Sequence, residues 1–254
     1  MRAGEQLRPA VAPRRRPISA RPIARLYGLG TALPGASAAQ STVMRFMTAA
    51  AKASGEEGAR AVPMIERLYR SSGIERRHSV LPDFAMEDPA DFKFFPKNAA
   101  LEPFPGTARR LELYERESVP LAEAAARRAL AQSGIAAAEV THLVYTTCTG
   151  FFAPGPDLLL MRRLGLRADV SRAQLGFMGC YAGFNALKLA QSAVAADPAA
   201  VVLIVAVELC SLHFQKRLLP DFLVANSLFA DGAAAAVFGA SSGGAGGLAD
   251  LAAT

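Results

Sequence analysis

Residues 171–190, SRAQLGFMGCYAGFNALKLA, predict a short apolar approach, a tight turn at Gly179 and then a helix. The turn places Cys180 at the helix start, where free backbone N–H groups and the positive end of the helix dipole favour the reactive thiolate. Because Gly179 and Gly183 carry no Cβ atom, a bulky acyl group could approach the backbone beside the sulfur. The alternative is that Cys180 is a small buried apolar residue. The stretch therefore indicates either a nucleophile or a core cysteine.

Strand-like and helix-like segments alternate around this stretch, which predicts an α/β fold with a mostly parallel sheet. Further strands are expected over residues 140–147, 201–207 and 232–238, and helices over residues 157–164 and 182–196. Ligands bind beyond the carboxyl ends of parallel strands. Three segments follow such ends, namely Cys148 with Thr149, the turn at Cys180, and residues 208–214. Their convergence predicts a thiol site.

The segments before residue 140 predict elements that surround this sheet. Residues 23–35 indicate a first strand and its loop, and residues 40–52 and 62–72 indicate two amphipathic helices separated by a polar stretch. The charged run GIERRH, residues 73–78, is typical of a solvated helix end. Residues 107–133 favour helix, which Pro120 is expected to divide or kink. Between these segments, residues 81–106 carry five phenylalanines that need burial, so an ordered loop is expected.

Composition limits the classes of function. The chain has 254 residues and a net charge of +6, of which six arginines and one glutamate in residues 1–21 supply +5. The remaining residues are close to neutral, so nucleic-acid binding would rest on this Arg/Pro-rich tail, which we expect to be disordered. The longest strongly apolar run, residues 201–209, is far shorter than the roughly 20 residues of a membrane helix, so no span is expected.

Cysteine usage and the C-terminal composition add two expectations. Cys148, Cys180 and Cys210 cannot form a fully paired disulfide framework and lack metal-ligand spacing, which favours a reducing cytoplasm and no metal site. We expect residues 22–240 to form one domain. Residues 241–254 are expected to be a Gly-rich linker followed by the start of a further segment.

Four motifs resemble the type III polyketide synthases, the homodimeric enzymes related to chalcone synthase. They are GIERRH, THLVYTTCTGFFAPGPD, GFMGCYAGFNALKLA and SLFADGAAAAVFGA. CTGFFAPGPD is closer to the bacterial alkylpyrone and alkylresorcinol synthases. The resemblance implies a thiolase-like fold of two similar halves with a buried nucleophile helix. It also implies transfer of an acyl starter from coenzyme A, here a long-chain fatty acyl group, to a cysteine, followed by decarboxylative condensation with malonyl-CoA. CoA thioesters are the substrates, and no cofactor is implied.

The resemblance assigns roles to individual residues. Cys180 matches the nucleophile, and Phe214 matches the gatekeeper phenylalanine, for which ordinary core packing is the alternative. Cys148 and Thr149 match the pair that shapes the initiation pocket. Arg67 matches one of three basic residues that bind CoA phosphates, whereas the other two positions are uncharged here.

The family's catalytic histidine and asparagine lie in its second half, and none of His78, His142 or His213 sits in a matching motif. We therefore expect this chain to be the amino-terminal part of such a synthase, holding the nucleophile without the decarboxylation residues and inactive by itself. We also expect it to expose the apolar faces that normally pack against the second half, which would reduce its solubility.

Three alternatives remain open at this point. One is the initiating β-ketoacyl synthase of fatty-acid synthesis, which shares the fold and uses acyl-carrier protein. Another is a non-catalytic remnant that binds acyl-CoA or pairs with a full-length subunit. The third is nucleic-acid binding through the arginine tail, which would be salt-dependent.

Overall fold

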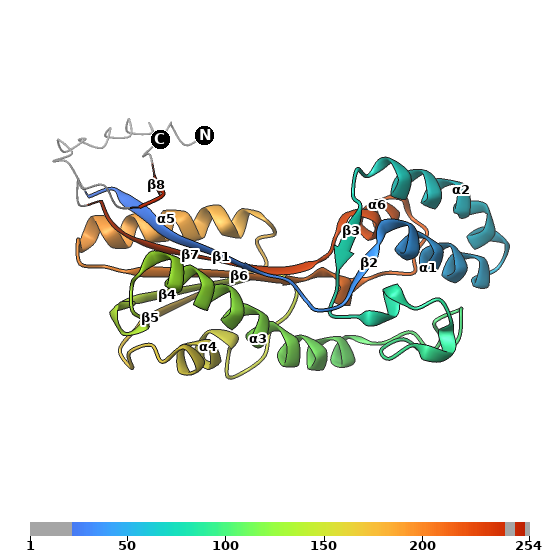
Figure 1. Ribbon diagram of the computed structural model, residues 1–254. Coiled ribbons are helices and arrows are strands. Elements are labelled where there is room, and N and C mark those ends of the chain that lie inside the picture. Colours follow the sequence, from blue (N-terminus) through green and yellow to red (C-terminus); the bar gives the residue numbers. More distant parts are fainter. Residues whose placement is uncertain (1–21, 242–246, 252–254) are drawn as a thin grey trace, which may run out of the picture.

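The computed structural model describes residues 22–241 and 247–251. The predicted tail over residues 1–21 lies outside the described residues, as does part of the predicted linker. The central feature is a six-stranded sheet of order β5-β4-β6-β7-β1-β8 (Figure 1). The strands are, in chain order, β1 Ala24–Ala32, β4 His142–Thr147, β5 Ser171–Gly176, β6 Val202–Leu209, β7 Asp231–Ala240 and β8 Ala249–Asp250.

The sheet is parallel on one side and antiparallel on the other. β4 pairs in parallel with β5 and with β6, whereas β7 pairs antiparallel with β6 and β1, and β8 pairs antiparallel with β1. Strands β5, β4, β6 and β1 therefore run in the same direction. This confirms the prediction that most strands of the sheet are parallel in orientation. The antiparallel pairings around β7 were not predicted.

Helices cover both faces of the sheet (Figure 1). On one face lie α3 (Thr107–Ser133) and α4 (Pro156–Leu164), and on the other lies α5 (Tyr181–Ala196). Helix α3 approaches β1 closely, because a Cβ atom at Gly30 would lie 2.2 Å from the carbonyl oxygen of Ala125. This close packing fixes α3 on the sheet.

Beyond one end of the sheet lies a second group of elements, called the cap here (Figure 1). The cap comprises α1 (Gln40–Ala53), α2 (Glu56–Ser71), α6 (Pro220–Leu228), the paired strands β2 (Ser37–Ala39) and β3 (Arg76–His78), and residues 79–106. Residues 79–106 include the short 3₁₀ turns Pro82–Ala85 and Pro89–Asp91, and two further 3₁₀ turns, Ala137–Glu139 and Cys210–His213, lie outside the cap. The cap positions one wall of the cavity described below.

The ordered loop predicted over residues 81–106 is confirmed. Its side chains Phe84, Phe92, Phe94 and Phe95 are buried. The carboxylate of Asp83 accepts hydrogen bonds from the backbone N–H groups of Lys93, Phe94 and Phe95 at 2.8–2.9 Å. Aromatic burial and this buried carboxylate together hold a segment that has little regular structure.

Three local predictions differ from the structure. Helix α2 begins at Glu56 and accommodates Pro63, so only two residues separate it from α1. Pro120 does not divide the predicted helix, because it lies inside one continuous helix α3 that packs along β1, β7 and α4. The charged run at residues 76–78 is not a solvated helix end but strand β3, in which Arg77 is buried.

The predicted burial of the nucleophile helix holds for one face only. Ala182, Ala186, Ala190 and Val194 of α5 are buried against the sheet, whereas Tyr181 and Phe184 are 53% and 61% exposed. Phe151, Phe177 and Met178 extend the same apolar surface around Cys180. Exposed apolar side chains gathered in this way are typical of a surface that contacts another protein segment.

None of the helices over residues 22–241 and 247–251 combines the length and apolar character needed to cross a bilayer.

Candidate active site

The turn before α5 brings Cys180 to the helix start. Phe177 and Gly179 both adopt left-handed backbone conformations, with φ of 56° and 59°. For a residue with a bulky side chain this conformation costs about 1–2 kcal/mol. Cys180 then caps α5 and is exposed. The predicted helix start is confirmed, and the alternative of a buried core cysteine is wrong.

Cys148 and Thr149 follow the end of β4 and lie beside this turn. The backbone N–H of Gly179 donates to Sγ of Cys148 at 3.1 Å. Thr147 of β4 is the register partner of Gly176 of β5, so the carboxyl ends of the two parallel strands are adjacent. The predicted convergence of the Cys148 and Cys180 segments is therefore confirmed.

Glu208, near the end of β6, joins this arrangement and was missed as a site residue. Its carboxylate accepts the backbone N–H of Cys148 at 2.9 Å and the hydroxyl of Thr149 at 2.7 Å. Burial raises the pKa of the Glu208 carboxyl group, although the hydrogen bonds from Thr149 and Cys148 lower it in part. An acidic residue ending the apolar run VVLIVAVE was the available signal.

Cys210 differs from Cys180 in its environment. Burial, and then the charges of Glu208, Asp231 and Cys180, raise the pKa of the Cys210 thiol to about 12. Cys210 is therefore a neutral thiol at physiological pH and a poor nucleophile. Because Cys180 is exposed, it is the better candidate for reaction with an external thioester.

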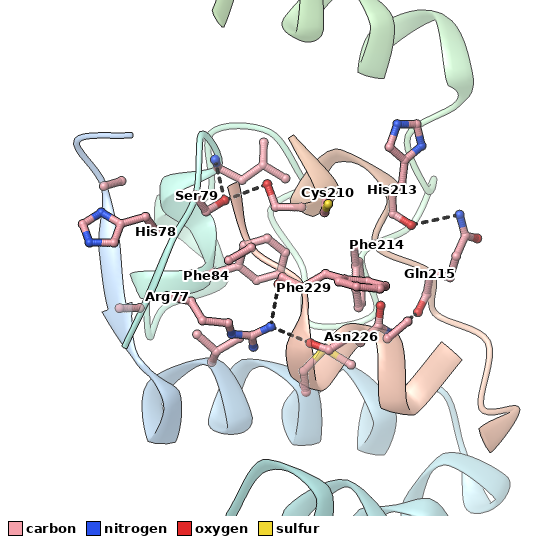
Figure 2. A pocket seen from close by; sticks show the side chains of 18 of the residues that line it. Arg77, His78, Ser79, Phe84, Cys210, His213, Phe214, Gln215, Asn226 and Phe229 are labelled. Atoms are coloured by element: carbon pink, nitrogen blue, oxygen red, sulfur yellow. Dashed lines mark hydrogen bonds between the residues drawn. The ribbon is translucent and has the colours of Figure 1, made fainter. Parts of the chain in front are cut away.

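A cavity of about 440 Å³ extends from Cys148, Thr149 and Cys210 into the cap. Its walls are mainly apolar and come from α1, β2, β3, the segment after β6, and α6 (Figure 2). The volume is within the range of about 300–1,000 Å³ that is usual for small-molecule sites. Its lining includes Val43, Met47, Leu81, Phe84, Phe222 and Phe229.

Phe214 lines this cavity and also belongs to the aromatic core. Phe214 is 5% exposed, and its ring lies 5.7–6.1 Å from the rings of Phe46, Phe84, Phe95 and Phe104. Phe229 lines the same cavity and is 56% exposed. Both rings therefore border the cavity, and the gatekeeper role of Phe214 stays a prediction.

The remaining candidate residues lie apart from Cys180 or are held by other groups. Arg67 is exposed on α2 and is not part of the cavity wall, so its CoA contact stays a prediction. His142 begins β4, at the opposite end of that strand from Cys148, and Nδ1 of His78 bonds to the carbonyl of Pro34. Nε2 of His213 donates to the carbonyl of Thr149 at 2.6 Å, which fixes this loop at the cavity.

Comparisons with known proteins agree with this arrangement. The profile of the N-terminal domain of chalcone and stilbene synthases matches residues 12–242. An alpha-pyrone synthesis polyketide synthase-like protein of Mycobacterium tuberculosis, Pks18, is 41% identical over 178 residues, which are 70% of this chain and 43% of the relative. The 1,3,6,8-tetrahydroxynaphthalene synthase of Streptomyces coelicolor is 33% identical over 177 residues, covering 69% of this chain and 43% of the relative.

Two solved structures share the fold. The polyketide synthase PKS-I of the brown alga Ectocarpus siliculosus superposes with a TM-score of 0.79 at 31% identity, over 89% of this chain and 58% of that one. The type III domain of Steely1 from Dictyostelium superposes with a TM-score of 0.73 at 29% identity, over 85% of this chain and 56% of that one. These neighbours confirm the thiolase-like fold. The chain spans less than half the length of the curated relatives it matches. It belongs to the chalcone and stilbene synthase family of type III polyketide synthases and carries the sequence of the N-terminal domain.

Proposed function

We propose that Cys180 is the acyl-accepting nucleophile of a type III polyketide synthase. The observation that carries the proposal is the position of an exposed cysteine at the start of α5, in a turn that contacts Cys148 at the end of β4, where Cys148 lines an apolar cavity. Backbone N–H groups at a helix start favour the anionic thiolate, which is the form that attacks a thioester.

The proposed step is a thioester exchange. The Cys180 thiolate attacks the acyl carbonyl of an acyl-CoA, a carbon–sulfur bond to Cys180 forms, and the bond to the CoA sulfur breaks. The CoA thiolate leaves and takes a proton from water. A protein thioester keeps the acyl group activated for later attack by a carbon nucleophile.

The apolar cavity supports a long-chain fatty acyl starter. Its mainly apolar wall, with Cys148 and Thr149 at one end, would shield an alkyl chain from water. Decarboxylative condensation with malonyl-CoA to an alkylpyrone or alkylresorcinol is proposed for the whole protein, since this chain spans 43% of the length of Pks18. A cytoplasmic homodimer that uses CoA thioesters without a further cofactor completes the proposal.

Intact-mass spectrometry after incubation with lauroyl-CoA tests the acyl transfer. The expected product is the protein plus one lauroyl group, formed by the native chain and absent from Cys180→Ala. Lauroyl-acyl-carrier protein, supplied in a parallel reaction, tests the β-ketoacyl synthase alternative. Preference for the carrier-bound substrate would favour that alternative, and no adduct on folded protein would favour a non-catalytic role.

A further inference from the structure

Met47 of α1 lies between the cavity described above, called the main cavity here, and a second cavity that is much smaller. The main cavity has a volume of about 440 Å³ and the second a volume of about 10 Å³. Met47, Phe214 and Gln215 line both of them. Residues that line two cavities lie between them, so these three side chains form the wall that separates the two spaces.

The sequence of α1 explains how the two cavities follow one another. Val43 lines the main cavity, and the small side chains that come after Met47 line the second, namely Ala50, Ala51 and Ser54. Positions four residues before Met47 and three, four and seven residues after it lie on the same face of a helix. Since an α-helix rises 1.5 Å per residue, this face continues along the second cavity for about 10 Å beyond Met47.

The other two wall residues have further contacts. The ring of Phe214 belongs to the aromatic cluster, and its carbonyl accepts a hydrogen bond from Nη1 of Arg110 at 3.2 Å. The carbonyl of Gln215 accepts one from Nδ2 of Asn226 at 2.8 Å. Met47 is 5% exposed, has no N–H or O–H group, and belongs to a residue type that adapts to irregular gaps. Its size can therefore change without leaving a strong hydrogen-bonding group unpaired.

We propose that Met47 sets the length of the alkyl chain that the main cavity accepts. A chain that enters beside Cys148 and Thr149 would follow the apolar wall until it meets Met47. Replacement by alanine removes Cγ, Sδ and Cε, which would join the two cavities along α1 and leave room for about two further carbon atoms. This inference rests on the proposed function, because an acyl starter in the cavity is the ligand whose length Met47 would limit.

Titration calorimetry with straight-chain alcohols, from 1-octanol to 1-tetradecanol, measures this limit without a thioester. Each CH₂ group that fits the cavity should raise the affinity of the native chain about fourfold, and the gain should stop at the length that fills the cavity. Met47→Ala should move this limit to alcohols about two carbons longer, and Met47→Phe should move it to shorter ones.

Met44→Ala is the matched control. Met44 lies on the same helix and packs against the same core, but it is not part of the wall of either cavity. The same chemical change at this position should therefore leave the limit of the native chain unchanged.

Because Met47 is a core residue, thermal unfolding must show that each variant is folded. Met47→Phe adds volume where Met47→Ala removes it, so either folded variant decides the proposal. A native series in which the affinity gain never stops would overturn it, as would the same limit in the native chain and in a folded Met47 variant. If the limit shifts as expected but lauroyl-CoA does not acylate the chain, the role of Met47 is supported and acyl transfer to Cys180 is contradicted. Acylation with an unshifted limit would show the reverse.

Discussion

Sγ of Cys148 lies 3.1 Å from the backbone nitrogen of Gly179 and accepts its hydrogen bond. Gly179 directly precedes Cys180, so this contact joins the end of β4 to the turn that presents the candidate nucleophile. Glu208 holds the backbone of Cys148 from β6. The turn itself follows β5. The position of Cys180 therefore depends on the three parallel strands β4, β5 and β6 rather than on its own turn alone.

The three cysteines should differ in their rates of alkylation. At pH 8, roughly one Cys210 side chain in ten thousand is a thiolate, because its pKa is raised to about 12. Iodoacetamide should therefore modify exposed Cys180 first and partly buried Cys210 last, as measured by peptide mass spectrometry over time. In urea the three rates should converge. Equal modification of Cys210 and Cys180 in the folded protein would contradict the described environments.

Phe214 and Phe229 should respond differently to truncation. Phe214→Ala removes a ring from the aromatic cluster and should destabilise the chain by about 3–5 kcal/mol. Phe229→Ala should cost less than about 1 kcal/mol, because the ring is more than half exposed. Phe229→Ala should instead slow labelling by lauroyl-CoA. Urea denaturation measures the first effect, and a native-like midpoint for Phe214→Ala would show that Phe214 is not a core residue.

Glu208→Gln should change how stability depends on pH. Burial raises the pKa of Glu208 above its ordinary value of 4.5. A carboxyl group with a raised pKa contributes stability that is present below the unfolded pKa and is lost as the pH rises through the folded pKa. Glutamine does not ionise, so the variant should gain melting temperature relative to the native chain between pH 4 and pH 8.

Thermal unfolding across this pH range measures the difference between the two proteins. Glu115→Gln makes the same chemical change on an exposed surface and serves as the control. A difference between native and Glu208→Gln that stays constant with pH would show that the Glu208 carboxyl group is not perturbed by burial.

Gly30→Ala should disrupt the contact between β1 and α3. The new methyl group would lie 2.2 Å from the carbonyl oxygen of Ala125, so the helix backbone must move. We expect a loss of about 2 kcal/mol or more in unfolding free energy. Gly35→Ala is the control, because no heavy atom lies within 4 Å of its Cβ position, and it should stay within about 0.5 kcal/mol. Similar denaturation midpoints for the two variants would contradict the close packing of α3.

Sequence patterns predicted the elements between residues 140 and 238 well, because short apolar runs alternate there with helical segments. They did not predict the direction of β7, since strand pairing is decided by contacts far apart in the sequence. The cap was harder still. The charged run at Arg77 has no periodicity that distinguishes a buried strand from a solvated helix end, and only the pairing with β2 decides this.

Only part of the site could be predicted from the sequence, and the reasons are similar. Cys148, Thr149 and Cys180 follow strand ends, so the rule for parallel sheets brought them together. Nothing in the sequence alone tells which of Phe214 and Phe229 has a free ring face, because both are phenylalanines near the end of an apolar segment. The packing of Phe214 against the cap, seen only in three dimensions, separates the two.

Peptide mapping of the acylated protein tests the central role of Cys180 most directly. Cleavage after arginine and lysine places the cysteines in separate peptides, with Cys180 in residues 173–188, Cys148 in residues 129–162 and Cys210 in residues 189–216. After brief incubation with lauroyl-CoA, the thioester should be found on residues 173–188 and be released by hydroxylamine. An acyl group on either of the other two peptides, with residues 173–188 unmodified, would contradict the assignment of Cys180 as the nucleophile.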